Sequence, residues 1–141
     1  RIYAERYQGY VDALTEAGIA LDTGIVWDLD ANEKQAEART NELLHMDNRP
    51  TALLCTNDTI AVGAVKAVLR AGLRVPEDLA IIGFDDSVVS RVIEPELTTV
   101  RIDSYRLGEL AAQLLFQLID GETLRQDRIT ISAELIVRGT T

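Results

Sequence analysis

The sequence predicts an α/β fold built on an open, doubly wound parallel sheet. Two apolar runs, residues 51–56 and 79–84, show no polar alternation, which is typical of strands buried on both faces. A helix-patterned stretch separates them, so the three segments form a β-α-β unit with parallel strands. Over the whole chain the predicted elements alternate between helix and strand, as a doubly wound fold requires.

Length and composition limit the classes of protein to consider. The chain has 141 residues and 47% apolar content, enough for one domain with a real core, and it starts at Arg1, so we expect a fragment of a longer chain. The net charge is −9 and the 14 basic residues are scattered, which argues against this segment wrapping nucleic acid. No apolar run approaches the roughly 20 residues that span a bilayer.

The first third of the chain predicts two helices and a short strand. Residues 4–17 carry apolar side chains at helical spacing, and Gly18 ends this amphipathic helix. Residues 24–27 form a short apolar stretch that we interpret as a strand. Asn32 is a suitable N-cap for a charged surface helix over residues 34–46.

The central part contains the β-α-β unit, a short helix and a further extended segment. The strand at residues 51–56 leads into a helix that we expect Asp58 to cap, and the strand at residues 79–84 comes next. The short helix is predicted at residues 87–93. Residues 98–102 are β-branched enough for a strand or a crossover.

The strongest helix signal in the sequence lies at residues 105–120. Its apolar positions follow the i, i+3, i+4, i+7 rule, and Gly121 ends it. The alternation over residues 129–137 then predicts a strand with one wetter face. The leucine stripe is formed by Leu107, Leu110, Leu114, Leu115 and Leu118.

Polar side chains follow both strands of the β-α-β unit, at the edge where ligands bind in open α/β sheets. Asn57 and Asp58 follow the first strand, and Asp85 and Asp86 follow the second. We interpret Asp58 mainly as an N-cap. The amide of Asn57 both donates and accepts hydrogen bonds, which suits a hydroxyl-bearing ligand, although a turn-stabilising role is equally compatible with the sequence.

Three further assignments stay open from the residues alone. Adjacent residues of an extended segment point to opposite sides, so Asp85 and Asp86 are not expected to form a catalytic pair; one faces the crevice, and Asp86 can instead cap the next helix. Arg6 is either a surface residue or a partner for ligand oxygens. Trp27, the sole tryptophan, either stacks on a ring-shaped ligand or belongs to the core or its rim.

Neither a metal site nor a cofactor site is predicted. His45 has no Cys or second His at ligand spacing, and Cys55 lies within an apolar strand as a small core residue. The nucleophile elbow, the P-loop, the dinucleotide fingerprint and the HExxH motif are all missing from the sequence. We therefore predict no catalytic residue and no enzyme. The alternative, a hydrolase that uses Asp85 as acid or nucleophile, has no partner base in the sequence.

A set of short motifs, in order and over nearly the whole chain, resembles the C-terminal part of lactose/galactose repressor-type transcription regulators. No single motif carries this resemblance; their order and spacing do. The motifs are Arg6-x-x-Gly9-Tyr10, the run from Thr51 to Asp58, Ala61-x-Gly63-Ala64, the run from Gly72 to Asp78, the run from Ile82 to Asp86, Pro95-x-Leu97-Thr98-Thr99-Val100, Leu107-Gly108 and Arg138-Gly139-Thr140-Thr141.

The resemblance implies a two-lobed, periplasmic-binding-protein-like effector domain of which this chain is mostly the second lobe. Residues 1–100 would belong to that lobe, residues 101–122 to a crossover and a helix of the first lobe, and residues 123–141 to the return into the second lobe. The helix-turn-helix domain and most of the first lobe would be absent. The leucine stripe is then expected to be exposed, repacked or buried against another chain.

The resemblance also implies a function. Arg6, Asn57 and Asp85 match positions that hydrogen-bond a small effector, commonly a sugar, with Trp27 as a weaker candidate. Binding would shift the populations of two lobe arrangements and so control operator DNA through the missing N-terminal domain. The regulator would be a cytoplasmic bacterial protein with no membrane contact.

A homodimer interface is implied around Val62 and near Ile93. The alternative from a different class is a secreted sugar-binding protein of a transporter, which shares the fold. The residues upstream of Arg1 would discriminate the two, because a helix-turn-helix supports the regulator and a signal peptide supports the transporter protein.

Overall fold

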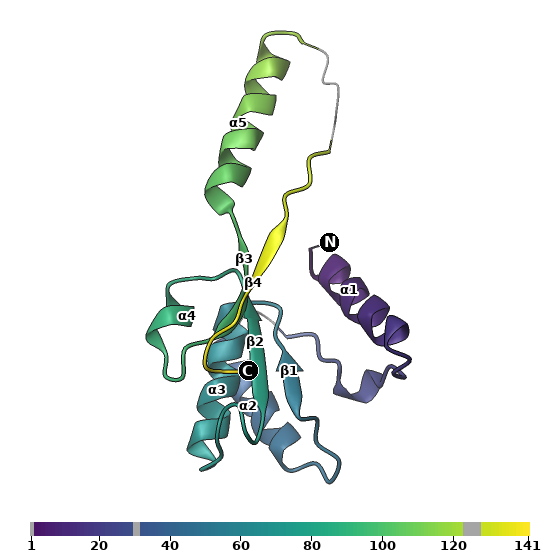
Figure 1. The fold of residues 1–141 in the computed structure, drawn as a ribbon, viewed down its shortest axis with the longest axis vertical. Helices are drawn as coiled ribbons and strands as arrows, with labels where there is room; N and C mark the ends of the chain where they lie inside the picture. Colours follow the sequence, from purple (N-terminus) through teal and green to yellow (C-terminus); the bar gives the residue numbers. More distant parts are fainter. Residues whose placement is uncertain (1, 30–31, 123–127) are drawn as a thin grey trace.

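In the computed structural model, which describes residues 2–29, 32–122 and 128–141, the chain forms an open four-stranded sheet in the order β1-β2-β3-β4 (Figure 1). The first three strands are parallel and the last is antiparallel to its neighbour. The predicted α/β fold with a mostly parallel open sheet is therefore confirmed. The strands are β1 Ala52–Leu54, β2 Ala80–Phe84, β3 Thr98–Ile102 and β4 Ala133–Ile136.

Helices connect the strands, and a short 3-10 helix stands alone. Most of the predicted helices are confirmed within a few residues of their expected ends. Among the described residues, no helix is both long and apolar enough to cross a membrane. The helices are α1 Ile2–Glu16, η1 Thr23–Ile25, α2 Glu33–Leu44, α3 Asp58–Arg70, α4 Val89–Val92 and α5 Ser104–Ile119.

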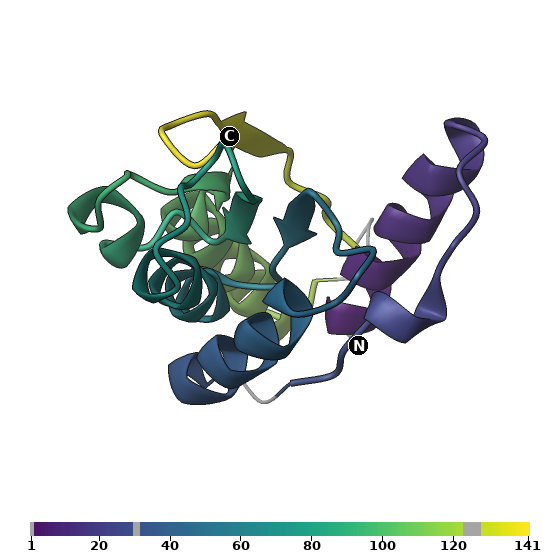
Figure 2. The same cartoon turned by 90° about the horizontal axis from the view of Figure 1, so that it is seen from below.

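The core lies where α3 packs between α2 and the sheet, as the view from below shows (Figure 2). Leu43, Val68 and Ile81 are fully buried there. The close approach of α2 and α3 depends on Gly63, because a Cβ at that position would overlap the Glu33 carbonyl oxygen and lie 2.9 Å from the Ala36 Cβ. Ion pairs also join the two helices at their solvent side: Lys66 with Glu33 at 2.6 Å, and Arg70 with Glu37.

A long arm leaves the sheet (Figure 1). The chain runs out along β3, forms α5 and returns along β4, which is why β4 pairs antiparallel with β3. No residue of α5 is buried in the described part of the chain. Leu115 and Leu118 are both more than half exposed, so the leucine stripe is exposed, which is one of the three expected outcomes. Residues 123–127, where the predicted return begins, lie outside the described residues.

The strand predicted at residues 24–27 is wrong. Thr23–Ile25 forms the 3-10 helix η1, capped by the Asp22 carboxylate, which accepts a hydrogen bond from the Gly24 N–H at 2.8 Å. Val26 has an extended backbone, but this segment pairs with no strand of the described residues. An extended segment without a neighbouring strand has unpaired backbone groups and gains no ladder hydrogen bonds, so its apolar composition alone does not make it a strand.

The expectation that β1 is buried on both faces is also wrong. The side chain of Leu54 is 54% exposed, because α2 and α3 cover only one face of the sheet (Figure 2). Helix α1 stands to the side of β1, and none of the residues of α1 whose side chains the structure describes is buried. The sheet is therefore covered well on one face only.

We predict that the space at Gly63 is essential to the core. Gly63→Ala should lower the free energy of unfolding by about 1–3 kcal/mol, because the new methyl group collides with backbone atoms of α2. Gly108→Ala is the matched control: a Cβ there meets nothing within 4 Å, so this helical substitution should raise stability by up to about 1 kcal/mol. Urea unfolding followed by circular dichroism measures both, and equal effects of the two substitutions would contradict the packing argument.

Candidate functional site

The polar residues that end β1 and β2 meet at one edge of the sheet, as the sequence predicts. Three of the four residues, Asn57, Asp58 and Asp86, are buried, and only Asp85 is exposed. The backbone turns sharply at the second pair: φ is +108° at Asp85 and +46° at Asp86. Such angles are unusual for residues with a Cβ and are found disproportionately at functional sites.

The N-cap of α3 is Asn57, and the prediction that Asp58 caps this helix is wrong. Asn57 has the extended backbone that an N-cap needs, and its Oδ1 accepts a hydrogen bond from the Ile60 N–H at 2.9 Å. The Asp58 carboxylate instead accepts from the Thr99 hydroxyl at 2.6 Å and from the backbone N–H and hydroxyl of Ser87 at 2.7 and 2.8 Å. Since its oxygen is committed to the cap, Asn57 presents its amide N–H groups as donors.

Asp86 does not cap the helix after it, which corrects that alternative. Its side chain is 2% exposed and accepts hydrogen bonds from three guanidinium groups, with distances of 2.7, 2.7 and 2.5 Å. Burial by itself raises the pKa of this carboxyl, but these hydrogen bonds outweigh it and hold the pKa well below its usual range. The donors are Arg91, Arg101 and Arg138, joined by the Ser90 hydroxyl at 3.2 Å. Sequence reasoning missed all four.

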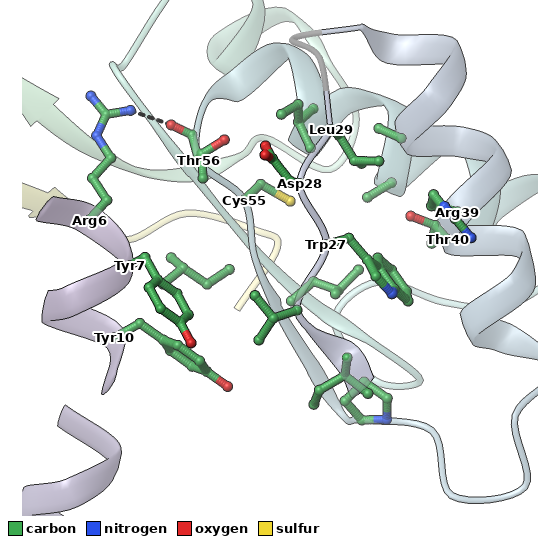
Figure 3. Close-up of a pocket in the computed structure, with 18 of the residues that line it drawn as sticks. Arg6, Tyr7, Tyr10, Trp27, Asp28, Leu29, Arg39, Thr40, Cys55 and Thr56 are labelled. Atoms are coloured by element: carbon green, nitrogen blue, oxygen red, sulfur yellow. Dashed lines mark hydrogen bonds between the residues drawn. The ribbon is translucent and has the colours of Figure 1, made fainter. Parts of the chain in front are cut away.

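Asp85 faces Arg6, so the structure brings two of the predicted site residues together. An Arg6 guanidinium nitrogen lies 3.3 Å from the Asp85 carboxylate, which is 47% exposed. Arg6 also donates to the Thr56 carbonyl oxygen (Figure 3), and its guanidinium carbon lies 3.6 Å from the centroid of the Phe84 ring. Burial, helped by the nearby Asp58, raises the pKa of Asp85, and Arg6 only partly offsets this.

A groove of about 700 Å³ runs between α1, the segment around Trp27, β1 and α2. Its lining is mostly apolar, with Arg6 at one end. Figure 3 shows Trp27 across the groove from Arg6, near Arg39 and Thr40. Trp27 packs against the core cluster, so the structure does not bring it to the Arg6–Asp85 pair.

Of the two residues assigned to a dimer interface, Ile93 is the C-cap of α4, and Val62 belongs to α3, which contacts α4. Val62 is buried and Ile93 is half-buried against the core. The exposed apolar side chains of this region are instead Val88 and Val92, which are 80% and 71% exposed and which sequence reasoning did not single out.

The described residues contain no group of three or more His, Cys, Asp or Glu side chains that could hold a metal ion. Burial, with a smaller contribution from the charge of Asp58, raises the pKa of the Cys55 thiol to about 12, so this thiol stays protonated at neutral pH. This agrees with its interpretation as a core residue. The chemistry that the edge offers is hydrogen bonding: a carboxylate acceptor at Asp85, and amide and guanidinium donors at Asn57 and Arg6.

A mostly parallel sheet with a carboxylate, a guanidinium and an amide gathered at the carboxyl ends of its strands is typical of α/β ligand-binding domains. The sequence profile of the periplasmic binding protein-like domain matches residues 1–141. The chain belongs to this family and is part of the effector-binding domain of a lactose/galactose repressor family regulator.

Individual relatives agree with this family assignment. The chain is 37% identical over 134 residues to the HTH-type transcriptional repressor PurR of Mannheimia succiniciproducens, covering 95% of this chain and 40% of that repressor. The transcription regulator CcpA of Lactococcus lactis has a similar structure, with a TM-score of 0.91 and 33% identity over 99% of this chain and 51% of the regulator. The complex of the regulator CelR with cellobiose gives a TM-score of 0.90 and 34% identity, over 98% of this chain and 42% of CelR. The chain thus spans about 40% of the curated PurR repressor that it matches.

We predict that the two adjacent aspartates affect stability in opposite directions. Asp86 has a depressed pKa, so its charge stabilises the fold above the unfolded pKa of about 4 and this contribution is lost as the pH falls. Asp86→Asn should therefore lower the free energy of unfolding at pH 7 by roughly 3 kcal/mol, the order seen when one partner of a buried ion pair is removed.

Asp85 has a raised pKa, so folding favours its protonated form; the stability this gives is present below about pH 4 and is lost as the pH rises through the raised pKa. Asp85→Asn should therefore keep or raise the melting temperature at pH 7, and asparagine tolerates the positive φ. Melting curves at pH 3, 5 and 7 measure both variants. A destabilising Asp85→Asn at pH 7 would contradict the assignment.

Proposed function

We propose that this chain is the effector-binding and dimerisation part of a bacterial DNA-binding regulator. The observation that carries the proposal is the convergence of Arg6 and Asp85 beside Asn57 at the carboxyl edge of a parallel sheet. The relatives are repressors, so we assign binding and no catalysis to this edge. Operator DNA would be bound by a segment outside this chain, since the chain itself carries a net charge of −9.

The effector that fits these groups is a small, neutral, hydroxyl-bearing molecule, in the first instance a sugar. Asp85 accepts hydrogen bonds from hydroxyl groups, while Asn57 and Arg6 donate to hydroxyl oxygens. The charges of Arg6 and Asp85 cancel, and the buried Asp58 carboxylate adds negative charge near Asp85, so the edge favours neutral ligands over phosphorylated ones. The cellobiose complex of CelR supports a sugar as the first class to test.

The proposed mechanism is a population shift. The effector would bind in the cleft between two lobes, better in one lobe arrangement than in another, and would thereby change operator binding in the cytoplasm. We assign residues 1–100 and 123–141 to the second lobe, and residues 101–122 to the crossover and helix of the first lobe. The projecting arm with the exposed helix α5 supports this division. The repressor relatives favour this function over the alternative of a transporter's sugar-binding protein.

We predict that sugars stabilise the full-length protein through these side chains. Thermal-shift measurements against mono- and disaccharides, nucleosides and sugar phosphates should give a stabilising sugar, and Arg6→Ala and Asp85→Ala should each remove that stabilisation. Asn57→Ser is a sharper variant than Asn57→Ala, because serine keeps an oxygen to cap α3 while it removes the amide donors. Ligand stabilisation that survives all three substitutions would refute the site.

We propose that a second copy of the protein binds the surface formed by the exposed side chains of Val88 and Val92, together with Ile93 at the end of α4 and Val62 of α3, the helix that contacts α4. In sedimentation velocity of the full-length protein, Val92→Glu should shift a dimer to monomer, because a charge replaces a desolvated apolar contact. Ile19→Glu is the control, because Ile19 is likewise an exposed apolar residue, with an exposed fraction of 57%, but it follows α1, which lies away from α4 (Figure 1). A wild-type monomer, or equal effects of both substitutions, would contradict this interface.

A further inference from the structure

Directly behind the proposed effector contact at Asp85 lies a cluster of charges that the binding chemistry does not use. Its centre is the carboxylate of the next residue, Asp86, which is 2% exposed. The three arginines that donate to it come from three different parts of the fold: Arg91 from α4, Arg101 from β3, and Arg138 from the segment after β4. One carboxylate thus joins three elements that are separate in sequence.

Two of these arginines lie on the segments by which the chain enters and leaves the arm. Arg101 lies in β3, on the way out to α5, and Arg138 follows β4, on the way back (Figure 1). Arg101 pairs with Glu134 of β4 in the strand register, and their charged groups lie 3.6 Å apart. Both ends of the arm are therefore tied to the same buried carboxylate, one through Arg101 in β3 and the other through Arg138 just after β4.

Hydrogen bonds tie this carboxylate to the rest of the candidate site. The Asp86 N–H donates to the Thr99 hydroxyl at 3.3 Å, and that hydroxyl donates to the Asp58 carboxylate at 2.6 Å. Asp58 is the residue after Asn57, just as Asp86 is the residue after Asp85. Asp85 and Asp86 are adjacent in a sharp turn, with φ at +108° and +46°, so a displacement of the Asp85 backbone also moves the peptide that carries the Asp86 N–H.

The cluster is balanced in charge. The positive charges of the three arginines are matched by Asp86, by Glu134 beside Arg101, and by Glu96 at 3.7 Å from Arg138. The arrangement is therefore complete within the chain and needs no bound anion.

From this geometry we propose that Asp86 is a positioning residue that couples the candidate cleft at Asp85 to the direction of the β3-α5-β4 arm. The inference rests on the proposed function for its biological meaning, because the arm would reach into the other lobe. The mechanical link from Asp85 through Asp86 to the arm is the same whichever ligand binds.

The test is a distance measurement in the full-length protein with its reactive cysteines replaced. Spin labels at Ala71→Cys, beyond α3, and Gln113→Cys, on α5, report how the arm is directed relative to the sheet; both positions are exposed. Arg101→Met and Arg138→Met should shift or widen the distance distribution. Arg91→Met is the matched control: Arg91 and Arg101 each donate to the same Asp86 oxygen at 2.7 Å, but Arg91 belongs to α4 and not to the arm.

Stability alone does not discriminate, since each Arg→Met substitution removes a donor from Asp86 and should lower the melting temperature. The distance distribution does. If Arg101→Met and Arg138→Met melt earlier but keep the wild-type distribution, Asp86 only holds the fold together and the proposal is overturned. An equal change with Arg91→Met would overturn it as well.

The coupling to the cleft is tested by Asp85→Gly, which frees the backbone at a position where φ is +108°. This substitution should widen the distribution in the wild-type background and add little to Arg101→Met, because the link is already broken there. Full additivity would overturn the coupling. Ligand is absent from this experiment, so its failure is distinct from a failure of the sugar screen.

Discussion

The burial of two carboxylates, Asp58 and Asp86, is the constraint on which the rest of the carboxyl edge depends. A buried charge costs several kcal/mol unless its hydrogen bonds are satisfied, so the partners of these groups must stay in place. Those partners include Ser87, Thr99 and arginines of α4 and β3. These hydrogen bonds fix the end of β2, the start of α3 and the path of β3 relative to one another. They therefore also hold the neighbouring residues Asn57 and Asp85 in place.

The two buried carboxylates also explain why Asp85 is available to a ligand. The turn that lets Asp86 point inward leaves Asp85 half exposed beside Arg6, in an environment that raises its pKa while the pKa of its neighbour is depressed. Adjacent residues of one type thus have opposite energetic roles. A charged group such as Asp85, which the fold holds in place at a cost to stability, is typical of a binding site. A group such as Asp86, whose charge is stabilised by its hydrogen-bond partners, is typical of the structural core of the fold.

Periodicity predicted most helices and the central strands, because each is set by local pattern and burial. The sequence analysis assigned the N-cap of α3 to Asp58 instead of Asn57, because both residue types cap well and only the backbone conformation separates them. The strand expected at residues 24–27 failed because pairing, and not composition, makes a strand. Local sequence patterns could not predict the arginines that bind Asp86. Arg138, for example, is 52 residues from Asp86, and no feature of the sequence around Arg138 indicates that the two residues are in contact.

The contacts of Asp86 also bear on how helix α5 is presented by the sheet. Helix α5 has no buried residue among those described, yet its apolar side chains form one continuous stripe of the kind that soluble proteins cover. A helix that is to pack elsewhere must be presented at a defined angle, and only the paired strands β3 and β4 join α5 to the sheet in the described part of the chain. The arginines at the base of these strands add a second restraint, because both donate to one buried carboxylate at the edge of the sheet. The direction of the arm is therefore restrained at the residue next to Asp85 as well as along its own strands.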